Sequence, residues 1–396
     1  MNSINSTSEY FRFLDESFLE YFGQSPDLKI QAPGRINIIG EHLDYNDGLV
    51  MPAAIDKFIY FSVGKRRDSK VILKSIDMDS VFETEDINRF EIKTDHSWQN
   101  HLLGVIKEFS LNGIHFSSGI NVCFGGNIPN GAGLSSSAAV EAGIGTALNI
   151  LFDCGFDKLK LTKIAQQTEH KYVGVKCGIM DMFASIFSQK DQLIQLDCLD
   201  FTHKYVSGKF TDHEFILVNS GVKHTLADSQ YNIRRNQCET GLEELKKNFS
   251  EIKSFRDVKL PQIEILKKLD DPKVYERCEY VLEEIQRVFD ATEALEKGEM
   301  EKLGILLNGS HHGLSKKYEV SCEELDFLQN EALKINGVLG ARMMGGGFGG
   351  CTLNLVEKDS EESFKSKISV LYAEKFGIVP EIYVVNTGHG VAQVEL

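Results

Sequence analysis

The chain has 396 residues, of which 42% are hydrophobic and 26% are charged, a balance typical of a globular protein with room for two hydrophobic cores. Its 43 basic and 58 acidic residues give a formal net charge of −15 at pH 7, which argues against nucleic acid as a partner. No apolar run has the length of a membrane span, so we expect no membrane-embedded segment.

The cysteines and the first residues indicate where the protein resides. The eight cysteines include no CxxC pair and no Cys/His spacing typical of zinc sites. The polar segment 1–6 lacks the basic and apolar regions of a secretory signal. We therefore expect a cytoplasmic protein with reduced thiols. Because no feature indicates an extended interface between copies, we expect a monomer.

The predicted elements mix strands and helices along the chain. Short runs of apolar and β-branched residues predict strands at 58–63, 71–73, 119–124, 342–344 and 351–356, and a final strand at 381–385. Longer runs with helical character predict helices at 135–152, 161–172, 275–297, 321–335 and 361–376. Because no regular βαβ repeat emerges, the pattern favours an α+β fold over a doubly wound α/β fold. We place a domain boundary near residue 205, which gives the domains 1–205 and 206–396.

The densest group of hydrogen-bonding side chains lies in segment 32–45, APGRINIIGEHLDY. Arg35 lies in an apolar strand, and Glu41, His42 and Asp44 follow it after a turn glycine. A ligand with many hydroxyl groups needs such a set of donors and acceptors beside a rigid strand. The segment is therefore a candidate sugar pocket.

A glycine-rich loop, PNGAGLSSSAA at 129–139, leads into the predicted helix at 135–152. Glycines let the backbone approach a ligand closely, and the free N–H groups at a helix N-terminus attract anions. The loop lacks the lysine of the Walker A motif, and a glycine turn with serine N-caps is the alternative interpretation. The candidate phosphate-binding residues are Gly131, Ala132, Gly133, Leu134, Ser135, Ser136 and Ser137.

A second glycine run, GGGFGG at 345–350, contains a formal GxGxxG match. The strand predicted at 351–356 follows it, whereas a dinucleotide-binding turn opens into a helix. We therefore expect a tight loop whose backbone packs against another element.

Two acidic residues and two aromatic residues are further candidates. Asp181 lies among apolar residues, where it suits a base acting on a sugar hydroxyl or, alternatively, a helix cap. Glu169 can approach the serine loop as an oxygen ligand for Mg²⁺, or it is a solvated helix residue. Tyr231 can stack on a ligand or donate to its hydroxyl groups. Trp98, the single tryptophan, belongs either to the core or beside an adenine ring.

The order of these motifs resembles that of the galactokinases, which share a superfamily with homoserine, mevalonate and phosphomevalonate kinases. The two glycine loops mark the superfamily, whereas GRINIIGEHLDY and CGIMD mark galactokinases and their nearest sugar-1-kinase relatives. The resemblance spans about residues 32–352 and rests on these segments: GRINIIGEHLDY (34–45), PNGAGLSSSAA (129–139), KCGIMD (176–181), SQYNIRRNQCE (229–239) and GARMMGGGFGGC (340–351).

The resemblance implies phosphorylation of α-D-galactose at its anomeric hydroxyl by ATP with Mg²⁺, the first phosphorylation of galactose catabolism. It implies two lobes with the site between them: an N-terminal mixed sheet backed by helices and a C-terminal α+β sandwich. The partners would be the sugar and ATP.

The resemblance also implies a role for each candidate residue. Asp181 matches the catalytic base, and Arg35 matches the arginine that keeps this base ionised. Ser137 and Glu169 match the Mg²⁺ ligands. The ATP-binding positions are the loop 131–137 and Trp98, and the sugar-binding positions are Glu41, His42, Leu43, Asp44, Gly178 and Tyr231.

Three residues depart from the family pattern. Leu43 and Met344 replace a usual threonine, and Met182 replaces a usual glutamine. Loss of a hydrogen-bonding group changes substrate discrimination, so N-acetylgalactosamine, arabinose and galacturonate remain open as substrates. Galacturonate is the least favoured of these, because Glu41 and Asp44 would repel its carboxylate.

Two alternatives belong to other functional classes. One is a non-catalytic galactose sensor, which the intact Ser137, Glu169 and Asp181 disfavour. The other is a superfamily kinase for a non-sugar alcohol, which has no need of the GEHLDY segment.

Overall fold

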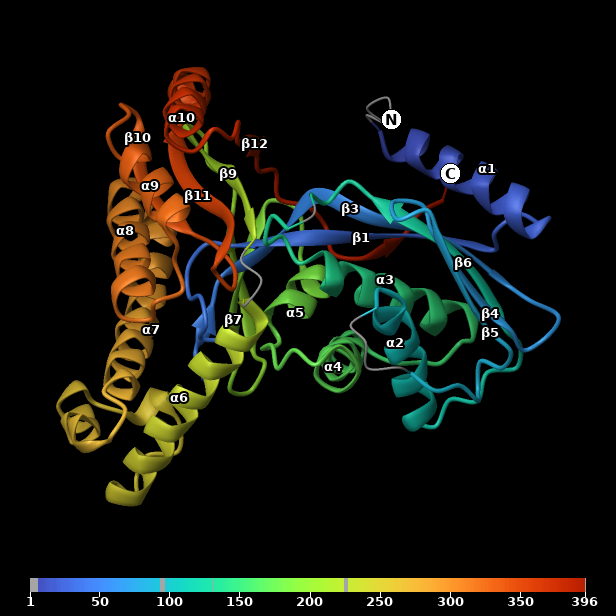
Figure 1. Ribbon diagram of the computed structural model, residues 1–396, viewed down its shortest axis with the longest axis horizontal. Coiled ribbons are helices and arrows are strands. Elements are labelled where there is room, and N and C mark those ends of the chain that lie inside the picture. Colours follow the sequence, from blue (N-terminus) through green and yellow to red (C-terminus); the bar gives the residue numbers. More distant parts are fainter. Residues whose placement is uncertain (1–5, 93–96, 130, 224–226, 396) are drawn as a thin grey trace.

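The computed structural model of the chain describes residues 6–92, 97–129, 131–223 and 227–395. Asn130 of the predicted phosphate loop lies outside these ranges. Among the helices in these ranges, none has both the length and the apolar character that a bilayer crossing requires. Figure 1 shows two parts side by side, one built on β1, β3 and β6 and the other on β9, β11 and the long helices α6 to α8.

The first part contains a six-stranded sheet in the order β13-β1-β3-β6-β4-β5. Only β4 and β6 are parallel neighbours, and the other pairs are antiparallel. Much of β1 and β3 is buried on both faces because helices lie above and below the sheet. The strands are β1 (Leu28–Asn37), β3 (Pro52–Lys65), β4 (Val71–Ser75), β5 (Ser80–Thr84), β6 (Ile120–Gly126) and β13 (Ala392–Gln393).

Helices on the two faces of this sheet bury its apolar side chains. On one face, Phe11 and Phe18 of α1 (Thr7–Phe22) belong to a buried cluster with Tyr60. On the other face, Gly143 allows close packing on β3, since a Cβ there would lie 2.2 Å from the Phe61 ring. The helices of that face are α2 (Gln99–Leu111), α3 (Ser136–Leu151), α4 (Lys158–Thr168) and α5 (Met180–Phe187).

The second part contains a four-stranded antiparallel sheet in the order β10-β11-β9-β12. Its strands are β9 (His213–Lys223), β10 (Val338–Met343), β11 (Gly349–Glu357) and β12 (Glu381–Val384). Val218, Leu328 and Phe364 share a buried cluster between this sheet and two of the helices. The helices are α6 (Ala227–Asn248), α7 (Lys273–Lys297), α8 (Met300–Lys316), α9 (Glu323–Ala332) and α10 (Glu361–Phe376), with short 3-10 turns at Phe255–Asp257, Leu260–Lys268 and Lys358–Ser360.

Two features join the parts. A small sheet of β2 (Leu49–Val50), β7 (Gln192–Asp197) and β8 (His203–Ser207) lies against α7. After β12 the chain returns to the first part, where β13 pairs with β1. The chain changes sheet between β8 and β9, and the division into domains 1–205 and 206–396 stays a prediction.

The α+β class is confirmed, and most predicted helices and strands are present. The helix predicted at 361–376 matches α10, and the helix predicted at 161–172 is α4 followed by a π-helical turn, Glu169–Val173. The prediction that 381–385 is the last strand was wrong, because β13 follows β12. Helices α1, α2, α5, α6 and α8 were not predicted.

Candidate active site

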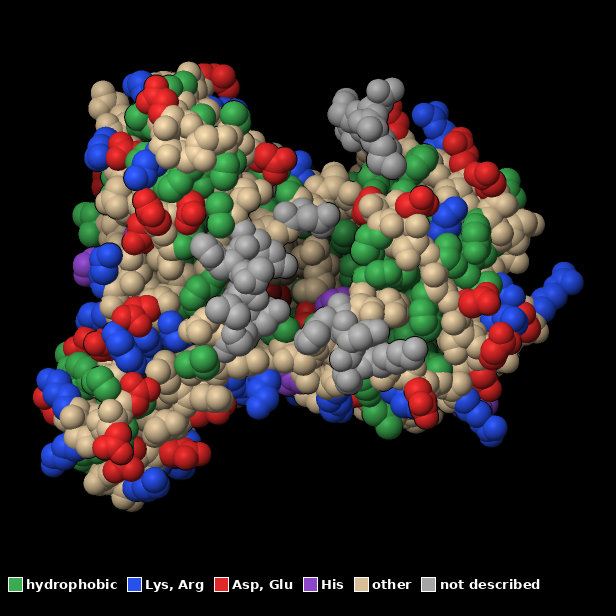
Figure 2. Space-filling model, viewed as in Figure 1, with side chains coloured by type: hydrophobic (Ala, Val, Ile, Leu, Met, Phe, Trp, Pro, Cys, Tyr) green, Lys and Arg blue, Asp and Glu red, His purple; other side chains and the backbone are tan. Residues whose placement is uncertain are grey.

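Two adjoining cavities lie between the parts and bring together segments that are far apart in sequence. Figure 2 shows the molecule hollowed there, with acidic and histidine side chains visible in the hollow. The first cavity, of about 380 Å³, is lined by Arg35, Glu41, His42, Asp44, His101, Ser136, Ser137, Glu169, Asp181, Met182, Tyr231, Gly345 and Gly346, among others. The second, of about 330 Å³, is lined by Arg35, Gly131, Gly133, Leu134, Ser135, Ser136, Ser137, Asp181, Met344, Gly346, Gly347, Gly349 and Gly350, among others.

Arg35 and Asp181 line both cavities and contact each other directly. Arg35 Nε donates to Asp181 Oδ1 at 2.8 Å and Nη2 donates to Oδ2 at 2.9 Å, a bidentate pair. Burial alone would lower the pKa of Arg35, but the charge of Asp181 carries it above its usual value. Ser135 Oγ also donates to Asp181 Oδ2, at 2.5 Å. These donors hold the Asp181 carboxylate in one orientation at the junction of the two cavities.

The glycine–serine loop begins the helix α3, and its backbone is held close to two other segments. Gly131, Gly133 and Ser135 have positive φ angles of 72°, 71° and 56°. Arg35 Nη1 donates to the carbonyl of Gly133 at 2.6 Å. A Cβ at Gly350 would lie 3.4 Å from the Ala132 backbone, so the second glycine run packs against this loop as a tight turn.

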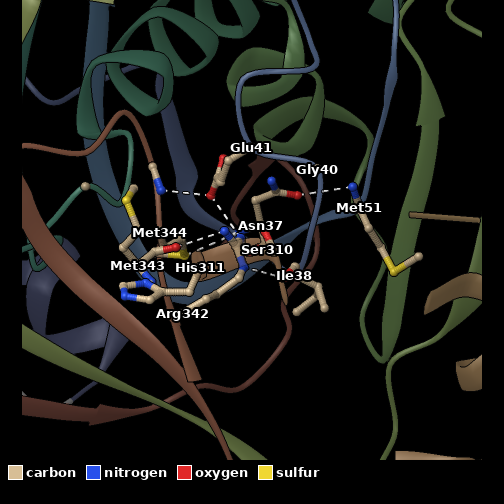
Figure 3. Close-up of polar contacts among 12 residues, drawn as sticks. Asn37, Ile38, Gly40, Glu41, Met51, Ser310, His311, Arg342, Met343 and Met344 are labelled. Atoms are coloured by element: carbon tan, nitrogen blue, oxygen red, sulfur yellow. Dashed lines mark hydrogen bonds and ion pairs between the residues drawn. The ribbon is translucent and has the colours of Figure 1, made fainter. Parts of the chain in front are cut away.

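A buried ion pair fixes the segment that follows β1 (Figure 3). Arg342 Nη2 donates to Glu41 Oε1 at 2.9 Å, and both side chains are almost fully buried. Arg342 also donates to the carbonyls of Asn37 and Ile38, at 2.5 and 2.7 Å. Gly345 N–H donates to the same Glu41 oxygen at 2.8 Å. Glu41 therefore ties the strand end, β10 and the second glycine run together, and at least one of its oxygens is already engaged.

Arg342 was not predicted from the sequence as a functional residue. The available signal was a single arginine in the apolar stretch that precedes the glycine run. A charged residue in such a stretch needs a buried partner of opposite sign.

Asp44 and Gly178 lie in direct contact. A Cβ on Gly178 would lie 2.0 Å from the Asp44 carboxylate, so only glycine leaves room for this side chain. Burial, and then the negative charges of Asp181 and Glu41, raise the pKa of Asp44 to about 7. The Asp44 carboxyl group therefore titrates near neutral pH.

His42 and Tyr231 form an aromatic wall of the first cavity. Their ring centroids lie 5.3 Å apart, and His42 Nδ1 forms a 2.8 Å hydrogen bond with Tyr45 Oη. His42 has a positive φ of 61°, which turns the chain sharply after Glu41.

His101, Glu141 and Glu169 form a cluster of possible metal ligands, and His101 and Glu169 line the first cavity. His101 Nδ1 lies 2.9 Å from Glu141 Oε1 and 3.9 Å from Glu169 Oε1, and one ligand atom from each residue lies within 4.8 Å of the others. Burial raises the pKa of Glu141 well above its usual value. Ser137 and Glu169, the predicted Mg²⁺ ligands, line this same cavity. His101 and Glu141 were not predicted, although Glu141 is a conspicuous acid in the otherwise apolar α3.

Comparisons with known proteins agree along almost the whole chain. Residues 16–65 match the galactokinase galactose-binding signature, 100–189 the GHMP kinases N terminal domain, and 291–373 the GHMP kinases C terminal domain. Galactokinase of Clostridium beijerinckii is 37% identical over 388 residues, which cover 98% of this chain and all of that protein. Galactokinase of Thermotoga neapolitana is 41% identical over 367 residues, 93% of this chain and all of that protein. The chain belongs to the galactokinase family.

Comparison with solved structures shows that the fold is also that of a galactokinase. The crystal structure of Lactococcus lactis galactokinase complexed with galactose has a TM-score of 0.92 and 33% identity, covering 97% of this chain and all of that one. Mevalonate kinase of Methanococcus jannaschii, at 18% identity and a TM-score of 0.66, covers 91% of this chain and shares the fold. The chain is therefore an ATP-dependent sugar kinase of the GHMP type.

Four residues singled out by the family resemblance differ in whether they reach a cavity: Leu43, Met182, Met344 and Trp98. Leu43 is fully buried against Gly48 and does not line either cavity described here. Met182 packs with Ala138 and Ala165 and reaches the first cavity.

Met344 lines the second cavity, and its sulfur accepts from Asn37 N–H at 3.5 Å. Trp98 precedes α2 with its ring 5.6 Å from that of Phe124, and it is absent from the described lining of both cavities. Its assignment to the adenine therefore stays a prediction.

Proposed function

We propose that this sugar kinase transfers the γ-phosphoryl group of ATP to the anomeric hydroxyl of α-D-galactose, giving α-D-galactose 1-phosphate and ADP. The observation that carries the proposal is the position of the Arg35–Asp181 pair between two cavities. One cavity presents acids, a histidine and a tyrosine suited to sugar hydroxyls, and the other presents the glycine–serine loop suited to phosphates.

In this proposal Asp181 accepts the proton of the anomeric hydroxyl while the oxygen of that hydroxyl attacks the γ-phosphorus of ATP. Arg35 orients the carboxylate through two hydrogen bonds and places positive charge beside the attacking oxygen. Phosphoryl transfer depends mainly on positioning and charge neutralisation, and both groups serve these ends.

The backbone of loop 131–137 and the N-terminus of α3 would hold the phosphates. The loop's left-handed residues leave N–H groups free to face an anion, and the dipole of a 16-residue helix favours negative charge at that end. The catalytic pair lies at the edge of the same cavity.

Mg²⁺ fits the residues present, because Ser137 and Glu169 offer hard oxygen ligands on the wall of the first cavity. Bound there, the ion would neutralise part of the triphosphate charge. Glu141 and His101 lie directly beside Glu169 and would fix its orientation.

The sugar contacts would come from Glu41, His42, Asp44 and Tyr231, with Gly178 making room for Asp44. Galacturonate is disfavoured because its carboxylate would meet Asp44, which is negatively charged above its pKa of about 7. Because Leu43 is buried away from the cavity lining, its change from the usual threonine is a weak reason to expect another sugar.

The test is an ADP-release assay with galactose, N-acetylgalactosamine, arabinose, galacturonate, mevalonate and homoserine, with ³¹P NMR of the product. We expect the highest kcat/KM with galactose and a 1-phosphate product. Higher kcat/KM with mevalonate or homoserine would contradict the proposal. Saturable galactose binding without turnover of any sugar would indicate the sensor instead.

We further propose that the protein acts as a cytoplasmic monomer whose partners are the sugar and ATP. The charge of −15 supports the absence of nucleic acid among its partners. Light scattering coupled to size-exclusion chromatography should give a mass near 44.4 kDa, and a dimer mass would contradict the monomer.

A further inference from the structure

A chain of hydrogen bonds runs from the wall of the first cavity into the interior of the second part. His42 Nδ1 lies 2.8 Å from Tyr45 Oη, Tyr45 Oη lies 3.0 Å from Tyr318 Oη, and Tyr318 Oη lies 3.1 Å from Cys238 Sγ. His42 and Tyr45 follow β1, Cys238 belongs to α6, and Tyr318 follows α8. We call these four residues the tyrosine relay. His42, Tyr318 and Cys238 are buried.

The cavity end of the relay presents an unsatisfied nitrogen. His42 Nε2 is buried and has no hydrogen-bond partner among the described residues, although the backbone of Gly346 lies nearby. A buried polar atom without a partner is costly, unless a ligand supplies the missing hydrogen bond. Because His42 lines the first cavity, a sugar hydroxyl in that cavity can supply it.

The imidazole ring has little freedom to turn. Its centroid lies 4.9 Å from that of Tyr318 and 5.3 Å from that of Tyr231, so two neighbouring rings pack against it. Asn46 Nδ2 donates to the His42 carbonyl at 2.7 Å and fixes the left-handed backbone. The remaining variable is which ring nitrogen carries the proton.

Burial, and then the charge of Arg234, lower the pKa of His42 to about 3, so the ring is neutral at physiological pH. A neutral imidazole has one N–H, and the hydrogen bond at one nitrogen sets the role of the other. An imidazole nitrogen is a much better acceptor than a thiol sulfur, so the direction that ends on His42 Nδ1 is favoured over the one that ends on Cys238 Sγ. The relay therefore runs from Cys238 through Tyr318 and Tyr45 to His42 Nδ1, which leaves the proton on Nε2.

We propose that Tyr45 and Tyr318 are positioning residues that hold His42 as the Nε2–H tautomer, with this N–H aimed at one hydroxyl of the bound sugar. This inference rests on the proposed function for the identity of the ligand. It assigns part of the sugar specificity to two tyrosines that act through His42, and one of them belongs to the C-terminal half of the chain.

The experiment compares wild type with Tyr45→Phe and Tyr318→Phe, which remove one hydroxyl each. The matched control is Tyr372→Phe, because the Tyr372 hydroxyl is also buried and donates to a carbonyl, that of Ser220, in the separate cluster under the second sheet. Thermal unfolding of each variant checks that the fold is retained.

The first readout is the tautomer of His42 in sugar-free protein, measured by long-range ¹H–¹⁵N NMR on ¹⁵N-histidine-labelled samples and assigned with His42→Gln. We expect the Nε2–H form in wild type and Tyr372→Phe, and a mixture or the Nδ1–H form in Tyr45→Phe. An unchanged tautomer in Tyr45→Phe, or the Nδ1–H form in wild type, would overturn the inference. This readout needs no turnover, so it stays decisive even if wild type fails to phosphorylate galactose.

The second readout is kinetic. Loss of one well-placed hydrogen bond should raise the KM for galactose roughly 5- to 30-fold in Tyr45→Phe, with kcat and the KM for ATP within about threefold. In wild type, the monodeoxy-galactose that lacks the hydroxyl contacted by His42 should have a higher KM than galactose. In Tyr45→Phe and in His42→Gln, this difference in KM between the deoxy sugar and galactose should disappear. Wild-type KM in both relay variants, in an enzyme that turns over galactose, would overturn the inference and leave the proposed function intact.

Discussion

Arg342 and Glu41 form a buried ion pair at 2.9 Å although they are 301 positions apart in the chain. The pair joins β10 to the segment after β1, and Gly345 N–H adds a second contact to the same Glu41 oxygen. Each charge is tolerated in the interior because the other is present. The position of Glu41 in the wall of the first cavity therefore depends on Arg342, a residue from the C-terminal half of the chain.

Removing one member of this pair should be costly. We expect Arg342→Met to destabilise the protein by about 3–5 kcal/mol, because Glu41 is left as a buried unpaired charge. Urea denaturation measures the free energy of unfolding. The double variant Arg342→Met with Glu41→Gln should recover part of the loss, and no recovery would show that the pair is not what the single variant disrupts.

Gly178→Ala should damage sugar binding without unfolding the protein. The added Cβ would overlap the Asp44 carboxylate and displace it from the cavity wall. We expect the KM for galactose to rise about tenfold or more, since roughly 1.4 kcal/mol of binding corresponds to each factor of ten. Gly145→Ala is the matched control, because its Cβ would meet side chains only at 3.7 Å and beyond. Equal KM values in the two variants would contradict the contact.

Asp44 should make stability depend on pH. Its pKa is about 7 in the folded protein, above the usual 3.8, so between these values the folded state binds more protons than the unfolded state. The contribution of this group to stability is therefore fully present below pH 3.8 and is lost as the pH rises through about 7. Asp44→Asn has no carboxyl group at this position, so its stability should not fall with pH for this reason.

We expect the unfolding free energy of Asp44→Asn, minus that of wild type, to increase from pH 5 to about pH 7 and to level off above it in urea titrations. A constant difference across this range would mean that Asp44 titrates as an ordinary carboxylate.

Glu169→Gln should weaken the use of Mg²⁺. Replacing a charged oxygen ligand by a neutral one should raise the Mg²⁺ concentration for half-maximal activity by roughly 10-fold or more, the lower end of what changes around a metal site cost. The measurement is an Mg²⁺ titration of activity at saturating sugar, paired with calorimetric titration of Mg·ATP. An unchanged Mg²⁺ requirement would remove Glu169 from the proposed metal site.

The parts of the fold predicted from sequence are those with strong local signals. The helix at 361–376 has acids in its first turn and ends at Gly377, which adopts a left-handed conformation. Helix α5 has only eight residues and is almost entirely apolar, so its pattern does not distinguish a helix from a buried strand. Helix α6 is long but strongly polar, with little apolar periodicity to reveal it.

The residues of the candidate site that were predicted from sequence also lie in strong local patterns, whereas the missed ones do not. The clusters at 35–44 and 131–137 are visible because their chemistry is concentrated in a few consecutive residues. Arg342, His101 and Glu141 were missed because each matters only through a partner that is distant in sequence. The role of Asp181 came from family resemblance, and the structure adds the two hydrogen bonds from Arg35 that no local pattern shows.

The central claim is that Asp181, oriented by Arg35, is the base of a galactose kinase. The most direct test is Asp181→Asn, with steady-state turnover measured alongside galactose binding by calorimetry. We expect kcat to fall by about 10²–10⁴-fold, the usual contribution of a general base, while galactose still binds. Near-normal turnover in the purified variant would contradict the account.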